Sequence, residues 1–151
     1  MASTARSYTT RRSAITKALA DKMALIDGRG IYHTAVAETS PRLKFWDEVE
    51  EFPAIHINAG SESRIYQAGG YKDRFLNLTV RCYVNEEEAV TALDELLEDV
   101  ETVLETNSKL LYHDRLGLEQ STHQITILSI DTDEGVLEPL GVGEILIEVR
   151  Y

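Results

Sequence analysis

The sequence predicts an α+β fold: a mostly antiparallel or mixed β-sheet with two main α-helices packed on one face. Two segments carry apolar residues at helical spacing, and others alternate apolar and polar residues as strands do. Their order along the chain is helix, strands, hairpin, helix and two strands. No repeat, low-complexity tract or linker interrupts the 151 residues, so we expect a single domain over residues 1–151.

The first helix is predicted over residues 10–27. Its apolar stripe consists of Ile15, Ala18, Leu19, Met23 and Ile26. Gly28 is typical of a helix C-terminus. Residues 31–37 follow as a predicted strand. Residues 1–8 are expected to form a flexible arm.

A connector with one helical turn or more is predicted over residues 43–51. We expect Phe45, Trp46 and Val49 to pin it to the body of the protein. A strand over residues 54–58 follows, in which alternate apolar residues point to one face.

A turn over residues 60–63 and then a hairpin are predicted next, with arms at residues 64–67 and 73–84. One face of the second arm carries Leu76, Leu78, Val80, Cys82 and Val84. The other face of the sheet is partly apolar, and we expect neighbouring subunits to cover Phe75, Tyr83 and Leu146.

The second helix is predicted to begin at Asn85, whose side chain would cap it together with Glu88. Residues 86–105 carry nine acidic and no basic side chains, so the face opposite the leucine-rich stripe is almost wholly anionic. Residues 107–120 are expected to be irregular, with one short helix over residues 108–112.

Two strands are predicted to close the fold. The first covers residues 122–131, and the second runs to Tyr151. In the second, Ile145, Ile147, Val149 and Tyr151 alternate with Glu144, Leu146, Glu148 and Arg150. Such alternation is typical of a strand with two unlike faces.

The net charge of −11 is unevenly distributed. Residues 1–30 carry six basic and two acidic side chains, whereas the remainder carries nine basic and 24 acidic ones. The acidic body argues against sequence-reading nucleic-acid binding, which requires neutralisation of phosphates. Opposite signs in the two parts of the chain suit self-association between copies, or serve solubility alone.

Composition also argues against several protein classes. No apolar run approaches the roughly 20 residues that span a bilayer, so no membrane contact is expected. The N-terminus lacks the apolar region of a secretory signal, although its Ser, Thr and Arg content leaves a transit peptide open. The single cysteine, Cys82, excludes an internal disulfide framework and is expected to be a core residue of a protein made in a reducing cytoplasm.

No pattern predicts a catalytic, cofactor-binding or metal-binding residue. Residues 131–135 are acidic, but the spacing of Gly135 does not fit an EF-hand calcium loop. The four histidines lack the spacing of a zinc site. We therefore expect no cofactor, no metal and no enzyme activity.

Four segments together resemble the tail-terminator, or tail-completion, proteins of long-tailed bacteriophages. They are AITKALADKMALI, FPAIHINAGSES, RFLNLTVRCYVNEEEAVTALDELLEDVETVL and SIDTDEGVLEPLGVGEILIEVRY. Their order and spacing carry the resemblance, which covers most of residues 13–151.

The resemblance implies a structural virion protein without catalytic activity. Such proteins form a hexameric ring on the head-proximal end of the tail tube, end its polymerisation and join the tail to the neck and head. The implied partners are other copies of the chain, the tail tube protein and a neck or head-completion protein. DNA would pass through the ring without specific binding, and the protein would be made in the host cytoplasm.

The resemblance also suggests three functional surfaces. A lumen-facing acidic helix would present Glu87, Asp94, Glu95, Glu98, Asp99, Glu101 and Glu105. The subunit interface would use Arg6, Arg11 and Arg12. A hairpin that docks on the tube would use Gln67, Tyr71 and Lys72.

Two other interpretations remain open at this point. One is a neck connector or minor tail protein, which differs from a terminator only in position. The other is a small enzyme or ligand-binding domain with a site assembled from His33, His56, Cys82 or His123.

Overall fold

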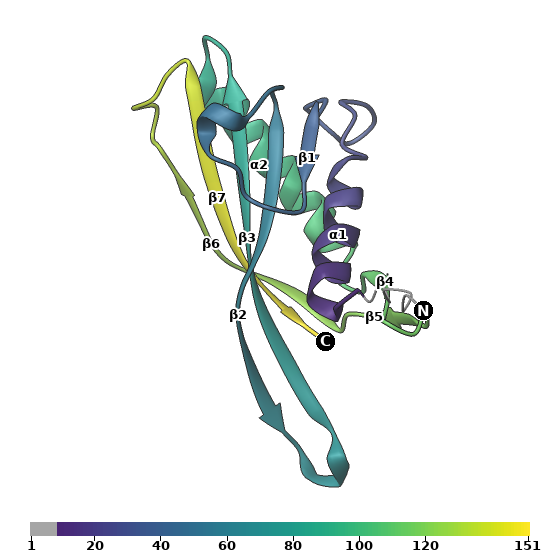
Figure 1. Cartoon of the computed structure of the whole chain (residues 1–151). Helices are drawn as coiled ribbons and strands as arrows, with labels where there is room; N and C mark the ends of the chain where they lie inside the picture. The colour runs from purple at the N-terminus through teal and green to yellow at the C-terminus, as the bar shows by residue number, and fades with distance from the viewer. Residues whose placement is uncertain (1–8) are drawn as a thin grey trace, which may run out of the picture.

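The computed structural model describes residues 9–151, so the arm expected over residues 1–8, including Arg6, lies outside the described residues. A five-stranded sheet has the order β1-β2-β3-β7-β6, with β1 parallel to β2 and the other neighbours antiparallel. Helices α1 and α2 pack against it (Figure 1). The predicted α+β class is confirmed. No helix within the described residues is long and apolar enough to cross a membrane.

The elements have the following bounds. The helices are α1 (Arg11–Met23), α2 (Ala89–Thr106) and the short 3-10 turns η1 (Trp46–Glu48) and η2 (Ala68–Gly70). The sheet strands are β1 (Glu38–Ser40), β2 (Ala54–Tyr66), β3 (Lys72–Asn85), β6 (Gln124–Thr132) and β7 (Leu140–Arg150). A separate two-stranded ribbon is formed by β4 (Leu111–His113) and β5 (Glu119–Ser121).

The core lies between the two helices and one face of the sheet. Alternation along β3 and β7 places one apolar set on that face, as predicted. The central sheet residues of this cluster are Ile55, Ile57, Leu78, Val80, Cys82, Ile145, Ile147 and Val149. From the helices, Ile15, Leu19, Met23, Leu93, Leu96 and Val100 join it. Burial raises the pKa of the Cys82 thiol to about 12, so this cysteine is an inert core residue.

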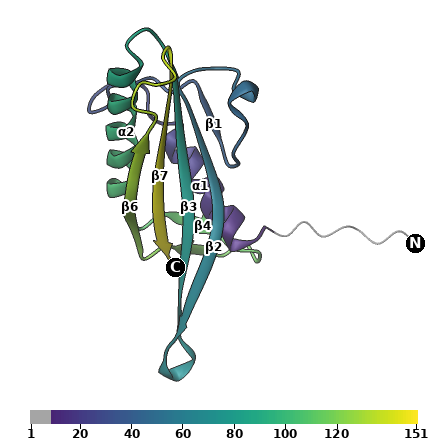
Figure 2. The same ribbon diagram turned by 90° about the vertical axis from the view of Figure 1, so that its left-hand side faces the viewer.

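The hairpin formed by β2 and β3 is longer than predicted and projects away from the rest of the sheet (Figures 1 and 2). The turn predicted over residues 60–63 is wrong. Ala59 pairs with Leu78 and Glu62 with Leu76, so β2 carries one extra residue as a β-bulge. The bulge accommodates Gly60 and lets the strand continue to Tyr66.

The predicted strand over residues 31–37 is also wrong. An isolated bridge joins Asp27 to Ala35, and the true strand, β1, begins at Glu38. The buried carboxylate of Asp99 in α2 accepts hydrogen bonds from two backbone N–H groups of this segment, those of His33 and Thr34. The segment is therefore a loop that packs against a helix.

The segments on either side of α2 differ from the prediction. The cap predicted at Asn85 is wrong because β3 continues through this residue, which pairs with Leu140, and α2 begins only at Ala89. The short helix predicted over residues 108–112 is wrong as well. There the Thr122 hydroxyl accepts from Leu110 N at 2.8 Å and holds the chain extended into β4.

The second sheet face is covered at one end by the chain itself. Val49, Phe52 and Val142 pack with the ring of Tyr83, which confirms Val49 as an anchor and leaves Tyr83 only 2% exposed. The expectation for Phe45 is wrong, because its side chain is 76% exposed. Leu146 is partly exposed on the uncovered part of this face.

Gly141→Ala is expected to lower the free energy of unfolding by about 1–3 kcal/mol through overpacking. The added Cβ would lie 2.7 Å from Val84 Cγ2 and 3.3 Å from the Ala89 carbonyl oxygen. Gly60→Ala is the matched control, because its Cβ would meet only the Asn77 carbonyl oxygen at 3.5 Å. Urea denaturation measures both, and equal losses in the two variants would contradict the packing argument.

Candidate functional site

The hairpin tip brings the three residues predicted for tube docking together. Gln67 N donates to the Tyr71 carbonyl oxygen at 2.7 Å, and Lys72 Nζ lies 6.0 Å from the centroid of the Tyr66 ring. Tyr66 and Tyr71 are 71% and 76% exposed, and Ile65 is also exposed. Sequence reasoning missed Ile65 and Tyr66, although both precede the predicted turn. The tip is an exposed apolar and aromatic surface at the end of a projecting ribbon.

At the hairpin root, by contrast, Tyr151 is buried and Glu62 and Arg74 are half-buried. Tyr151 and Arg74 exchange backbone hydrogen bonds of 2.9 and 3.1 Å. The Tyr151 hydroxyl donates to Glu62 Oε1, and Arg64 Nε donates to Glu62 Oε2 at 2.9 Å. Burial acts to raise the pKa of Glu62, but these two hydrogen bonds outweigh it and hold the pKa below its ordinary value. The carboxylate is therefore ionised and accepts from both neighbours.

The acidic face of α2 is only partly as predicted. The side chains exposed on it are Asp94, Glu95, Glu98 and Glu105, while Glu101 is half-buried and Glu87 is exposed just before the helix. Asp99 is the exception, because it is 1% exposed and faces the body of the protein. A buried side chain cannot line a channel, so the expectation for Asp99 is wrong.

Asp99 instead anchors the segment that precedes β1. Its carboxylate accepts from His33 N at 2.9 and 3.1 Å and from Thr34 N at 2.8 Å. On the helix surface beside it, His33 Nε2 lies 3.1 Å from Glu98 Oε1. Two of the acidic residues of α2 thus have partners within the subunit.

His33 is expected to titrate above its ordinary pKa of 6.5, because the hydrogen bond to Glu98 and the charges of Asp99 and Glu95 favour the protonated ring. The stabilisation from this pair is fully present below pH 6.5 and is lost as pH rises through the raised pKa. Glu98→Gln should lower the titration midpoint of His33 measured by NMR. Glu105→Gln, which removes a more distant charge of the same helix, should leave it nearly unchanged.

The two described arginines predicted for the subunit interface contact their own chain. Arg12 Nη2 donates to the Gly60 carbonyl oxygen at the bulge of β2. Arg11 lines a cavity of about 440 Å³ beside the hairpin root, together with Arg74 and Arg115. Both side chains are half-buried, so the part that they can offer to a second subunit is limited.

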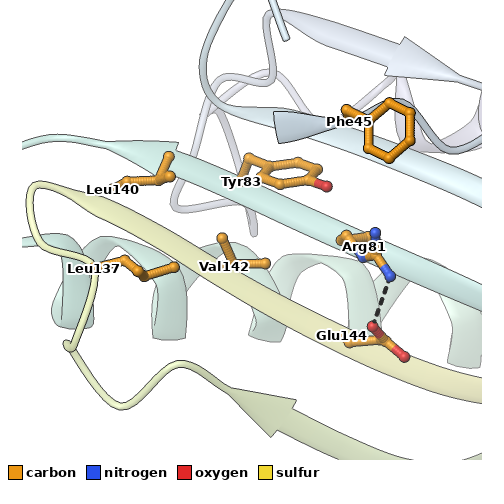
Figure 3. Close-up of a pocket in the computed structure, with 7 residues that line it drawn as sticks. All are labelled: Phe45, Arg81, Tyr83, Leu137, Leu140, Val142 and Glu144. Carbon is orange, nitrogen blue, oxygen red and sulfur yellow. Dashed lines mark hydrogen bonds and ion pairs between the residues drawn. The ribbon is translucent and has the colours of Figure 1, made fainter. Parts of the chain in front are cut away.

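An apolar hollow of about 590 Å³ lies on the second sheet face, beside the segment that covers Tyr83 (Figure 3). The ion pair between Arg81 Nη2 and Glu144 Oε2, at 3.1 Å, closes one end of it. The remaining lining comes from Phe45, Tyr83, Leu137, Leu140 and Val142. The hollow is lined mainly by apolar side chains and has one ion pair. Such a surface suits packing against another protein better than binding a polar ligand.

The residues considered for an enzyme site are not brought together. Cys82 faces the core, whereas His56 lies on the opposite sheet face with its Nε2 2.7 Å from Glu38 Oε2. His33 contacts α2. Within residues 9–151 no three histidine, cysteine or acidic side chains are grouped so that they could hold a metal ion.

Comparison with known proteins identifies the family. The family model described as "Bacteriophage Tail Tube Terminator Protein" matches residues 9–151. The chain is 28% identical over 149 residues to the tail tube terminator protein p142 of Escherichia phage T5, covering 93% of this chain and 92% of that protein. A chain in the virion of a native gene transfer agent particle has a similar fold, with a TM-score of 0.52, 8% identity and 93% of each chain covered.

The resemblance inferred from the sequence is thereby confirmed. The family match extends from just before α1 to Tyr151, whereas the similarity to the gene transfer agent chain concerns the fold alone. The chain belongs to the bacteriophage tail tube terminator family and is a structural, tail-terminating protein of the virion.

Proposed function

We propose that this chain forms a ring of six subunits. The ring caps the head-proximal end of the tail tube and joins the tube to the neck. The observation that carries the proposal is the projecting β2–β3 hairpin with its exposed apolar tip (Figure 2). An exposed apolar patch at the end of a projecting element is typical of a protein contact. The chain acts through assembly and not through catalysis.

In this proposal the hairpin docks on the last ring of the tube. Ile65, Tyr66 and Tyr71 supply apolar contact area, and Gln67 and Lys72 supply the polar rim. The other end of the subunit then faces the neck. There Val136 is 82% exposed, and the apolar hollow opens on the sheet.

Two surfaces of the subunit are candidates for the wall of the channel through which DNA passes. The acidic helix face is the first candidate, because an anionic wall does not neutralise phosphates and so does not bind DNA. The uncovered part of the second sheet face is the other candidate, because α1 and α2 both lie on the opposite face of the sheet (Figure 2). This face carries both signs, with Arg81 and Arg150 beside Glu144, Glu148 and Asp131.

Charge reversal separates the two candidates. Asp94→Lys with Glu95→Lys places two cations on the helix, and Glu144→Lys with Glu148→Lys places two on the sheet face. The pair that lines the channel should make assembled rings retain DNA in a salt-sensitive way. The other pair serves as the control. Retention only with the sheet-face pair would refute the helix as the channel wall.

Ring closure requires a contact between two different patches of neighbouring subunits. We retain Arg6, Arg11 and Arg12 as candidates for the basic side of this contact, opposite an acidic patch of the next copy. Reversing Arg11 should then weaken the assembly more at low than at high salt. An unchanged assembly would exclude this residue.

The decisive experiment is the mass of the purified protein in solution, across a range of salt and with purified tail tubes. A six-fold ring, or monomers that assemble only on tube ends, supports the proposal. A protein that stays monomeric and does not bind tubes at any salt concentration refutes the proposal.

A further inference from the structure

The outer part of the hairpin receives no support from the rest of the sheet. β3 pairs with β7 only as far as Phe75, opposite Arg150, and Tyr151 continues this pairing to Arg74. Beyond that point β2 and β3 pair only with each other within the described residues. A two-stranded ribbon twists and bends easily. The direction in which the tip points is therefore set at the root.

Tyr151 occupies the root and contacts both strands of the hairpin. Its backbone pairs with Arg74 of β3, and its hydroxyl donates to Glu62 of β2. The bulge of β2, where the ribbon leaves the body, ends at Glu62. The residue thus ties the two strands to each other and to the end of β7 at the point where bending would occur.

The surroundings of Tyr151 hold its ring in one orientation. The ring is 6% exposed and packs edge-on against Tyr112, with ring centroids 6.4 Å apart. The Arg74 guanidinium lies 5.4 Å from the ring centroid on its face. A ring held this way presents its hydroxyl to Glu62 in a fixed direction, and Arg64 fixes the second carboxylate oxygen.

We propose that Tyr151 and Glu62 are positioning residues that hold the β2–β3 hairpin at a fixed angle to the body, so that its tip meets the tube. This inference rests on the docking role proposed above. Neither residue touches the tube. They act by keeping the tip preorganised, which reduces the conformational freedom lost on docking.

The test measures the angle separately from docking. Ala68→Cys at the tip and Glu105→Cys at the end of α2 introduce exposed sites for two spin labels, while Cys82 is fully buried and stays unlabelled. Pulsed electron resonance then gives the distance distribution between tip and body. Tube capture and melting temperature are measured on the unlabelled variants.

Tyr151→Phe removes the hydroxyl and keeps the buried ring. The expected results are a clearly broader distance distribution and tube capture weakened on the order of tenfold, as for the loss of a hydrogen bond to a charged group. Tyr112→Phe is the matched control, because it removes a hydroxyl from the adjacent buried ring and leaves the Glu62 contact in place. Glu62→Gln keeps an acceptor oxygen, so it should fall between the wild type and Glu62→Leu.

An unchanged distance distribution in both Tyr151→Phe and Glu62→Leu would overturn the proposal. A broader distribution with unchanged capture would overturn the link to docking. If the wild type captures no tubes, the proposed function fails, yet the distance measurement still decides whether these residues fix the hairpin.

Discussion

Replacement of Ile65, Tyr66 and Tyr71 by serine in one variant is expected to abolish capture of tube ends without lowering the melting temperature. The three side chains are exposed at the hairpin tip and contribute nothing to the core. Aromatic side chains at the centre of an interface each account for about 2 kcal/mol or more, so their joint loss should weaken capture by more than about 100-fold. Co-sedimentation of the protein with purified tubes measures the capture.

Val136→Ser is the matched control for this variant. Val136 is more exposed than any of the three tip residues, and it lies in the β6–β7 connection at the other end of the sheet. It should leave capture unchanged. Normal capture by the triple variant would show that the tube is contacted elsewhere.

Asp99→Ala should lower the free energy of unfolding by about 2–4 kcal/mol. The substitution leaves the N–H groups of His33 and Thr34 without their acceptor beneath the segment that leads to β1. Buried donors without a partner are among the most destabilising defects in a core. Urea denaturation, with a fixed slope for the unfolding transition, measures the loss.

Asp94→Ala is the control on the same helix, because Asp94 is exposed and its loss should change the free energy of unfolding by less than about 0.5 kcal/mol. The prediction is tested by the difference between the losses of unfolding free energy in the Asp99 and Asp94 variants. Similar effects from both would mean that Asp99 contributes through general charge and not through its backbone hydrogen bonds.

The parts of the fold that could be predicted are those in which local periodicity and packing agree. Strand β3 alternates in sequence and in burial from Leu76 to Cys82, so the prediction of its core face is confirmed. Residues 31–37 are also predicted as a strand, yet the N–H groups of His33 and Thr34 bond to Asp99, 66 and 65 residues away in the chain. Such a long-range side-chain acceptor leaves no local signal, so the sequence alone does not distinguish this loop from a strand.

The candidate surfaces likewise divide into those with a local sequence signal and those that depend on long-range contacts. The turn chemistry of Gly69 and Gly70, both at positive φ, located the hairpin tip correctly. The helical spacing of acidic residues suggested one uniform face, but one position in the stripe, Asp99, turns inward. The root at Tyr151 and Glu62 could not be foreseen, because it joins residues 89 apart through side chains.

Among residues 9–151, strand β6 forms the outer edge of the sheet, and its nine residues pair with β7 on one side only (Figure 1). An open edge with the exposed side chains of Leu128 and Ile130 is a template for unwanted pairing between chains. A bulge between Ile127 and Ser129 interrupts that row of backbone groups. The free subunit thus carries its own protection against aggregation, and a straightened edge would lead to fibres and precipitate instead of a soluble pool of subunits.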